Sequence, residues 1–498
     1  MSEVPQFPLF VVVTHALNIL FVTLLMRSGL EVLSSLPKFY WSDGCPPGRE
    51  WLRLSRKTFG GDSRRPWVSL DEEESWHPVI ALPGRKNLGL GRHWHFLTVQ
   101  FWVATGLVYV IMVFATGYWQ YLVPQHWSIM PEAVRDIGTY LHFELAPQLP
   151  GQPFDAAQKI AYFAVVFVLC PIQIASGAAM SPAVLARYPR YGRLFGGKQG
   201  ARSIHFLGLC ALAGFVVVHL FMVVVHGIPK EFAKIFFGSE DADRTLATVV
   251  GSLTLLAIII IHILATVLSR RHPRGTQRLL GISVHRLEYA LSVLGRPRQR
   301  YRRRDISEYH RVNGYPPPDE NYRRLAADSF RGYRLPVGGL VANPTTLTLG
   351  ELARLGMTRQ ITNHNCIQGW NSIAEWGGVP LSALIELVRP TDSVTHVVFY
   401  AMDDKGLTEG QGRYGYFYEA VPIAIARAPQ ALLAMEMNGA PLPIEHGAPL
   451  RLRLENQLGY KMVKWIKAIE FVDDITEIGM GQGGYREDQL HYANAAGI

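Results

Sequence analysis

Five long apolar segments crowd the first 270 residues of this 498-residue chain. At a rise of 1.5 Å per residue, about 20 residues span the roughly 30 Å hydrocarbon core of a lipid bilayer. Five such segments in succession leave too little polar sequence to enclose them as core helices of a soluble protein. The sequence therefore predicts an all-α membrane bundle of five transmembrane helices over residues 1–270. The segments are residues 7–26, 96–115, 160–179, 204–225 and 246–268.

The first apolar segment has neither a basic leader nor a small-residue cleavage site. Cleavable signal peptides carry both features. We therefore expect this segment to remain as the first helix of a multi-pass membrane protein.

Residues 271–320 have the composition of a basic linker, with six arginines among the nine residues 296–304. An RNA-binding patch would need aromatic rings for base stacking, and Tyr301 is the only one in this run. Contact with anionic lipid headgroups beside the last span is the better interpretation. We expect no nucleic-acid partner.

Residues 321–498 have a soluble character. Short strand-like runs at 394–400 and 450–454 are separated by turn dipeptides such as Asn438-Gly439. One segment, Leu381–Val388, has a clear helical pattern. The chain is therefore predicted to continue as a mixed α+β domain.

Histidines lie inside the apolar segments, where a polar side chain is costly unless it has a use. His205 and His219 are 14 residues apart, which on a helix is about 21 Å and roughly 40° short of whole turns. Because consecutive spans alternate in direction, His95 on the second span matches the depth of His205. His15 on the antiparallel first span matches His219.

Two histidine pairs at two depths predict two haem irons with bis-imidazole ligation, suited to electron transfer. A histidine bonded to a neighbouring helix is the alternative for any one of these residues. No Cys-x-x-Cys-His motif occurs, so the haems would be held without covalent attachment. His93 and His262 stay open as replacements for His95.

Residues 7–270 resemble the bacterial cytochrome b561 and hydrogenase-type cytochrome b family. The resemblance implies two haems b and electron exchange with the quinone pool of the bacterial inner membrane. It does not locate the quinone site. The motifs that carry it are residues 13–18, Ser28-Gly29, residues 91–96 and 195–205, and His219.

Cys366 is a polar-region thiol, and a thiolate is the ligand that a soft, high-valent metal prefers. Taken alone, it would more often be an inert packed residue. Its surroundings resemble the sulfite-oxidase-type molybdopterin domain over about residues 330–475. The matching segments are residues 337–344, 364–370, 438–443, 446–451 and 459–465.

The resemblance implies that Cys366 binds molybdenum through sulfur. It also implies that His446 and Arg451 hold the pterin cofactor, and that Met462, Val463 and Lys464 offer backbone amides and an ammonium to its phosphate. Lys461 is a second candidate for the phosphate. A looser match suggests that Asn321 and Tyr322 contact the cofactor. For Lys461, Lys464 and Arg451, alternation with apolar residues also permits a solvated strand face.

Gln368 limits the mechanism. The methionine-sulfoxide reductase branch of the family has a carboxylate two residues after its cysteine, whereas Gln368 can orient a substrate oxygen but cannot move a proton. Sulfite oxidases surround their cysteine with arginine, and residues 363–375 contain none. Neither substrate therefore transfers directly.

Loop charge predicts the side of the membrane. Loops 31–94 and 181–203 contain ten and five Lys or Arg residues, against two and three in loops 124–159 and 229–244. The positive-inside rule places the basic side, and with it the α+β domain, in the cytoplasm. The family resemblance favours the opposite, periplasmic side, and both stay open.

The combined prediction is a membrane-bound molybdenum oxidoreductase. It would transfer an oxygen atom to or from a sulfoxide, an N-oxide or a small oxo-anion, and exchange electrons with quinone or quinol through two haems. One alternative is a quinone-linked sulfite dehydrogenase. Another is a haem electron conduit or redox sensor whose pterin domain is not catalytic. The predicted domains are residues 1–270, the linker 271–320 and the molybdopterin domain 321–498.

Overall fold

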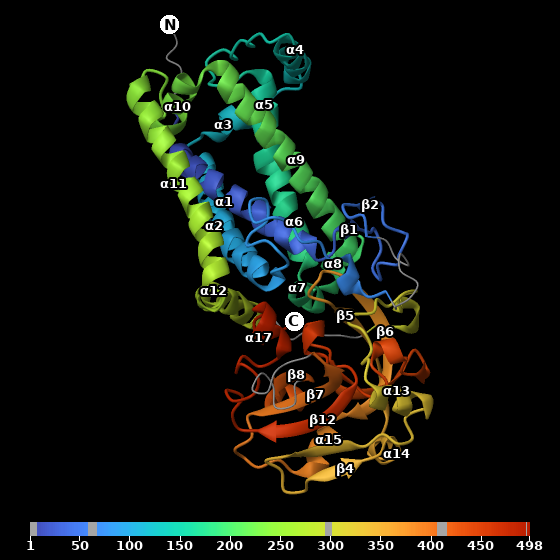
Figure 1. Ribbon diagram of the computed structural model, residues 1–498. Coiled ribbons are helices and arrows are strands. Elements are labelled where there is room, and N and C mark those ends of the chain that lie inside the picture. Colours follow the sequence, from blue (N-terminus) through green and yellow to red (C-terminus); the bar gives the residue numbers. More distant parts are fainter. Residues whose placement is uncertain (1–6, 58–66, 294–300, 406–415, 495) are drawn as a thin grey trace.

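The computed structural model describes residues 7–57, 67–293, 301–405, 416–494 and 496–498. A long helical bundle stands on a strand-rich head (Figure 1). The N-terminal end of the chain lies at the end of the bundle far from the head, and the C-terminus lies between bundle and head.

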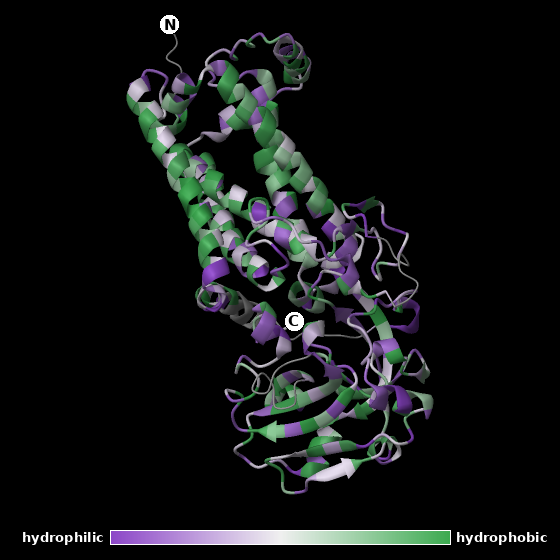
Figure 2. Ribbon diagram, viewed as in Figure 1, coloured by the Kyte–Doolittle hydropathy of each residue, from purple (hydrophilic) through white to green (hydrophobic). Residues whose placement is uncertain are grey.

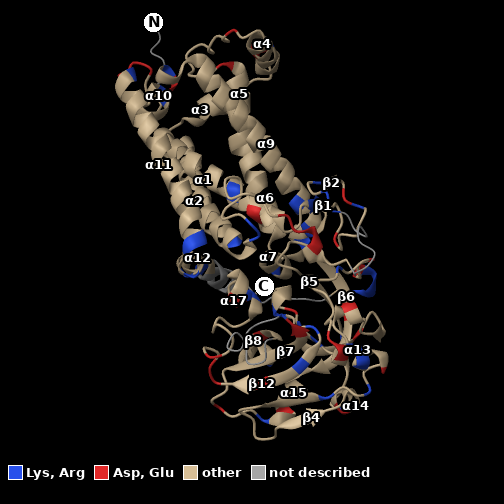
Figure 3. Ribbon diagram, viewed as in Figure 1, with Lys and Arg blue, Asp and Glu red and all other residues tan. Residues whose placement is uncertain are grey.

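Within the described residues, five helical spans are long and apolar enough to cross a membrane, as predicted, so this is a multi-pass membrane protein. Figure 2 shows the apolar character along the length of the bundle, and Figure 3 shows charged residues gathering at its ends and on the head. The third span contains a π-helical stretch just before Pro171, which lacks the N–H that a regular helix would use. The spans are α1 (Leu9–Ser34), α2 (Leu88–Ala115), α5 (Ala156–Phe163) with η2 (Ala164–Leu169) and α6 (Cys170–Met180), α9 (Gly197–His226) and α11 (Arg244–Arg271).

Shorter helices close both ends of the bundle. The far end carries α3 (Trp119–Leu122), α4 (Ile129–Leu141) and α10 (Ile228–Phe237). The head-side end carries α7 (Pro182–Arg187), α8 (Pro189–Arg193) and α12 (Pro273–Val293), which lies across the ends of the spans (Figure 1). Of the predicted basic run 296–304, only residues 301–304 fall within the described part of the chain.

The head is built from two five-stranded sheets, which confirms the predicted mixed α+β class. Their shared core contains Leu335, Phe399, Leu433 and Leu452, and α15 (Leu381–Val388) packs on it at the predicted residues. One sheet holds β5 (Thr358–Asn365), β6 (Asn371–Pro380), β9 (Ala431–Met437), β10 (Ala440–Pro441) and β11 (Arg451–Leu454). The other holds β3 (Leu335–Gly339), β4 (Thr345–Leu347), β7 (His396–Asp404), β8 (Tyr416–Pro422) and β12 (Ile466–Val472).

The remaining elements are small. The loop between α1 and α2 carries β1 (Lys38–Phe39), β2 (Leu52–Arg53) and η1 (Ser69–Glu72). The head adds α13 (Glu320–Ala327), α14 (Leu349–Ala353), α16 (Ile423–Ala426), α17 (Tyr485–Leu490) and the single turns η3 (Arg303–Asp305), η4 (Ile444–His446) and η5 (Gly459–Lys461).

The head docks on the bundle through an apolar cluster that joins Leu88 and Ala186 to Ile367 and Tyr460, and through hydrogen bonds. Gln199, in the first turn of α9, donates from Nε2 to the carbonyl of Gly369 and to Oδ1 of Asn371, each at 3.0 Å. Arg274 of α12 donates to the carbonyl of Glu487 at 2.6 Å. The two Gln199 bonds fix the turn between β5 and β6 against the helix that carries His205 and His219. The Arg274 bond fixes α17 against α12.

Candidate functional site

The far half of the bundle contains the first histidine pair. The ring centroids of His15 on α1 and His219 on α9 lie 6.1 Å apart. A metal–imidazole bond of about 2 Å would place two rings on opposite sides of one metal about 6 Å apart. Nδ1 of His15 is buried without a partner among the described residues. The spacing fits two axial ligands of one haem iron.

The head-side half contains the second histidine pair, and each of its two imidazoles is hydrogen-bonded to a serine hydroxyl in the same way. Nδ1 of His95 lies 3.1 Å from Oγ of Ser28, and Nδ1 of His205 lies 3.1 Å from Oγ of Ser176. Each serine hydroxyl already donates to a carbonyl one turn earlier in its own helix, so its oxygen accepts from the imidazole. The proton is thereby held on Nδ1, which leaves Nε2 as the free ligand atom.

A glycine follows each serine in this second pair. A Cβ on Gly29 would lie 3.5 Å from Cε1 of His95, and one on Gly177 would lie 3.5 Å from Cε1 of His205. Two unconnected helices therefore present the same Ser-Gly pair to the two histidines. This repeat fits two histidines that would hold one haem in equivalent ways.

His262 is engaged differently. Its Nε2 lies 2.9 Å from Oγ1 of Thr23, and its Nδ1 lies 2.8 Å from the Arg27 guanidinium. With both ring nitrogens occupied by protein groups, it is poorly placed to bind a metal. His93 directs Nδ1 to the carbonyl of Gly89 at 2.7 Å, inside its own helix.

Cys366 opens the tight turn between β5 and β6. The strands pair up to Asn365 and Asn371, and the Cys366 amide donates to the carbonyl of Trp370 at 3.0 Å. Gly369 closes the turn with φ of +112°, a conformation that disfavours any side chain. The thiol is buried, and burial raises its pKa to about 11.

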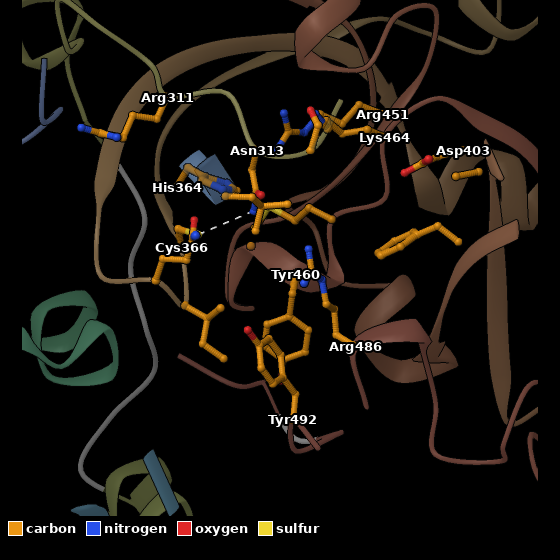
Figure 4. A pocket seen from close by; sticks show the side chains of 18 of the residues that line it. Arg311, Asn313, His364, Cys366, Asp403, Arg451, Tyr460, Lys464, Arg486 and Tyr492 are labelled. Atoms are coloured by element: carbon orange, nitrogen blue, oxygen red, sulfur yellow. Dashed lines mark hydrogen bonds between the residues drawn. The ribbon is translucent and has the colours of Figure 1, made fainter. Parts of the chain in front are cut away.

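A cavity opens beside this thiol (Figure 4). Three separate parts of the chain line it: the loop between α1 and α2, the linker, and the head. The first two contribute Leu70, Glu73, Arg311, Asn313 and Gly314.

One wall of the cavity is strongly cationic. Burial and the neighbouring Arg453 hold the pKa of Arg451 well below its ordinary value. Burial and Arg451 do the same to the pKa of Lys464. Nε of Arg451 is buried without a partner among the described residues. Arg451 and Lys464 destabilise each other's charged form, and an anionic group between them, such as a phosphate, would stabilise both cations.

A second wall surrounds the thiol with neutral amides and one carboxyl. Nδ2 of Asn313 lies 3.8 Å from Sγ of Cys366, and Oε1 of Gln368 lies 3.5 Å from it. Nε2 of Gln368 donates to Oε1 of Glu73 at 2.7 Å. Burial raises the pKa of Glu73.

Arginines also reach the cavity. Arg311 is neutralised, because it forms an ion pair with Glu72 at 2.7 Å. Arg486 on α17 points into the cavity (Figure 4), and its guanidinium forms no hydrogen bond or ion pair with any described residue. The absence of arginine from residues 363–375 is therefore offset by arginines from distant segments.

The structure brings some of the predicted cofactor residues together and places others elsewhere. Lys461 is buried in ion pairs with Glu419, at 2.9 Å, and with Glu487, on the side away from the cavity. Tyr322 is a core residue that donates to the carbonyl of Ala448, and Asn321 faces Arg324 at the surface. Val463 packs in the core, and His446 is buried near Arg451. The predicted residues that line the cavity are Cys366, Gln368, Arg451, Met462 and Lys464.

Sequence reasoning missed Glu73, Asn313, Tyr460, Arg486 and Tyr492. Most of these are separated from the cysteine by more than 90 residues of chain, so no local pattern marks them. Two signals were visible: Tyr460 lies within the matching segment 459–465, and Asn313-Gly314 is a turn dipeptide within the linker.

Comparison with known families identifies both parts of the chain. Residues 6–238 match the prokaryotic cytochrome b561 family, and residues 324–477 match the oxidoreductase molybdopterin-binding domain. The chain joins a cytochrome b561 domain to a molybdopterin-binding oxidoreductase domain. This confirms both predicted resemblances and supports haem b and molybdopterin as cofactors. The two histidine pairs and the cationic cavity fit those groups.

Individual relatives cover only part of each protein. YedZ1 of Azospira oryzae, provisionally named a protein-methionine-sulfoxide reductase subunit, is 34% identical over 34% of this chain and 57% of its own length. The catalytic subunit MsrP of protein-methionine-sulfoxide reductase from Xanthomonas axonopodis pv. citri is 34% identical over 28% of this chain and 45% of its own length. This chain thus spans about half the length of the curated relatives it matches.

Among solved structures, the sulfane dehydrogenase SoxCD from Paracoccus pantotrophus is 23% identical. The match covers 32% of this chain and 40% of that chain at a TM-score of 0.26, a likeness that carries no functional argument.

Proposed function

We propose that this protein is a quinol-linked molybdenum reductase that removes the oxygen atom from a sulfoxide. Two of its relatives bear the name of protein-methionine-sulfoxide reductase. The cavity beside Cys366 supports a reaction site, because it combines a buried thiol, a carboxyl and an unpaired arginine around one space. When bound, the molybdenum cofactor would supply the two-electron oxygen-atom transfer.

The protein's own residues would hold and orient the reacting groups. Cys366 would bind the metal, and Arg451 and Lys464 would hold the pterin phosphate, since burial and a neighbouring cation lower the pKa of each. Arg486 would donate a hydrogen bond to the sulfoxide oxygen. Tyr460 and Tyr492 line the side opposite the cationic wall and would exclude water from the substrate.

The observation that carries the proposal is the docking of the Cys366 turn on α9. Gln199 bonds directly to the carbonyl of Gly369, three residues after the cysteine. Six residues, or about 9 Å of helix, separate Gln199 from His205. A haem held by His95 and His205 would therefore lie close to the cavity and could deliver electrons through this contact.

The second haem would continue the path across the membrane. His219 follows His205 by about 21 Å on α9, towards the end far from the head. We propose that a haem held by His15 and His219 receives electrons from quinol near that end. Loop charge supports a cytoplasmic head, with 15 basic residues in the head-side loops and five in the opposite loops.

The domain boundaries are part of this proposal. The end of α11 at Arg271 supports a cytochrome domain over residues 1–270. The start of α13 at Glu320 supports a head over residues 321–498, with a linker at 271–320 between them.

The test is steady-state turnover by the detergent-purified protein together with its iron and molybdenum content. We expect two irons per molybdenum, and oxidation of a quinol analogue on addition of methionine sulfoxide. Reduction of a quinone on addition of sulfite would instead favour the dehydrogenase alternative, for which the unpaired Arg486 is the supporting observation. Iron without molybdenum, from cells that make the cofactor, would leave only the haem conduit.

A further inference from the structure

One acidic side chain reaches the head's cavity from the membrane domain. Glu73 follows η1 in the loop between α1 and α2 and lines the cavity that contains Cys366. Asp403 is the other carboxyl in the lining, and it is paired with Lys405 at 2.6 Å. Glu73 forms no ion pair with a described residue and accepts its hydrogen bond from Gln368.

The orientation of Gln368 is set by its other neighbour. Nε1 of Trp370 donates to Oε1 of Gln368 at 3.1 Å, and an indole N–H can only donate. The amide oxygen must therefore face Trp370, which turns the amide N–H group towards Glu73. Cys366, Gln368 and Glu73 thus form one connected series along the cavity wall.

Charged and titratable groups face Glu73 from several elements. Lys57 and Lys86 belong to its own loop, Arg486 comes from α17, and Glu31 comes from α1. The Cys366 thiol and the Tyr492 hydroxyl also face it. The cations and the Gln368 bond lower the pKa of Glu73, but burial outweighs them and the net shift is upward. Glu73 therefore keeps its proton at a higher pH than an exposed glutamate would, which suits a general acid.

We propose that Glu73 is the proton donor of the reaction, a catalytic residue that the membrane domain supplies to the head. The proposal rests on the proposed function. Reduction of a sulfoxide breaks the S–O bond and consumes two electrons and two protons, giving a thioether and water. The electrons come from quinol through the haems. Glu73 gives one proton to the departing oxygen. The second proton, and the proton that restores Glu73, come from hydronium or buffer acid in the solvent, so that two protons are taken up for each sulfoxide reduced.

The test compares Glu73→Gln with Glu74→Gln in the full-length, cofactor-loaded protein. Glu74 is adjacent but faces away, bonded to Ser55 at 2.5 Å and to Lys57 at 3.5 Å. We expect E73Q to lower kcat per molybdenum for methionine sulfoxide by about 10²–10⁴-fold, the usual contribution of a general acid. E74Q should stay within about twofold of wild type, and E73D should recover part of the loss.

A second readout does not depend on turnover. Infrared difference spectra recorded against pH, without substrate, should show a protonated carboxyl that is present in wild type and E74Q and absent in E73Q. Haem content and quinol-driven haem reduction should be unchanged in all variants, because Glu73 contacts neither histidine pair.

Two outcomes would overturn the proposal while leaving the proposed function intact. One is wild-type kcat per molybdenum in E73Q with an unaltered pH profile. The other is a set of protonated-carboxyl bands in E73Q that is identical to that of wild type, because Glu419 and Asp403 also have raised pKa values and keep their bands in both proteins. A molybdenum-loaded wild-type protein that reduces no sulfoxide would overturn the proposed function, and the donor role with it.

Discussion

The serine that holds each head-side histidine should tune the potential of one haem only. Oγ of Ser176 accepts from Nδ1 of His205 at 3.1 Å, and this bond makes the imidazole a stronger electron donor to iron. A stronger donor stabilises the ferric state. Ser176→Ala removes the acceptor and should therefore raise the midpoint potential of that haem.

The size of the shift follows from the energy of the bond. A hydrogen bond of this kind contributes about 0.5–1.5 kcal/mol. A tenfold change in equilibrium, about 1.4 kcal/mol, corresponds to 59 mV for a one-electron couple. The expected shift is therefore about 20–60 mV in the positive direction. Ser28→Ala, which affects His95 in the same way, should give a similar shift, and the double variant about their sum.

The assay is a spectroelectrochemical titration of the haem absorption bands in the purified protein. The haem proposed at His15 and His219 is the internal control, since neither serine contacts that pair, and its potential should not move. Equal shifts in both haems, a negative shift, or no shift in either variant would refute this assignment of the head-side ligands.

Three other substitutions test the site separately. Cys366→Ser should abolish sulfoxide reduction while both haems are retained, as measured by turnover and haem absorbance. His262→Ala should keep the full haem content but lower the free energy of unfolding by about 1–3 kcal/mol, because Thr23 and Arg27 each lose one hydrogen bond; thermal unfolding would measure this loss. Gly459→Ala should reduce molybdenum content, because its Cβ would lie 2.5 Å from His364 beside the cavity, whereas Gly338→Ala meets nothing within 4 Å and should not.

Much of the membrane domain was predictable because its rules are local. The length of an apolar run sets a span, and the alternating direction of spans sets which histidines share a depth. The structure brings His15 to His219 as that argument requires. The sequence singled out only one of the two Ser-Gly pairs, Ser28-Gly29. The second, Ser176-Gly177, could be recognised only from its contact with His205 in the structure.

The cavity was less predictable because most of its walls are tertiary. The cysteine turn and the cations of residues 451 and 464 belong to one domain and could be named from sequence. Glu73 enters from a loop almost 300 residues earlier, and Arg486 from a helix near the C-terminus. For Lys461, neither the cofactor role nor the solvated strand face anticipated the buried pairs with Glu419 and Glu487.

The central claim is that electrons pass from the haems to the cavity at Cys366. The most direct measurement is anaerobic stopped-flow absorbance of the quinol-reduced protein mixed with methionine sulfoxide. The account predicts rapid haem oxidation, with two haem electrons lost per thioether formed, and none in Cys366→Ser. Haems that stay reduced in molybdenum-loaded wild-type protein would contradict it.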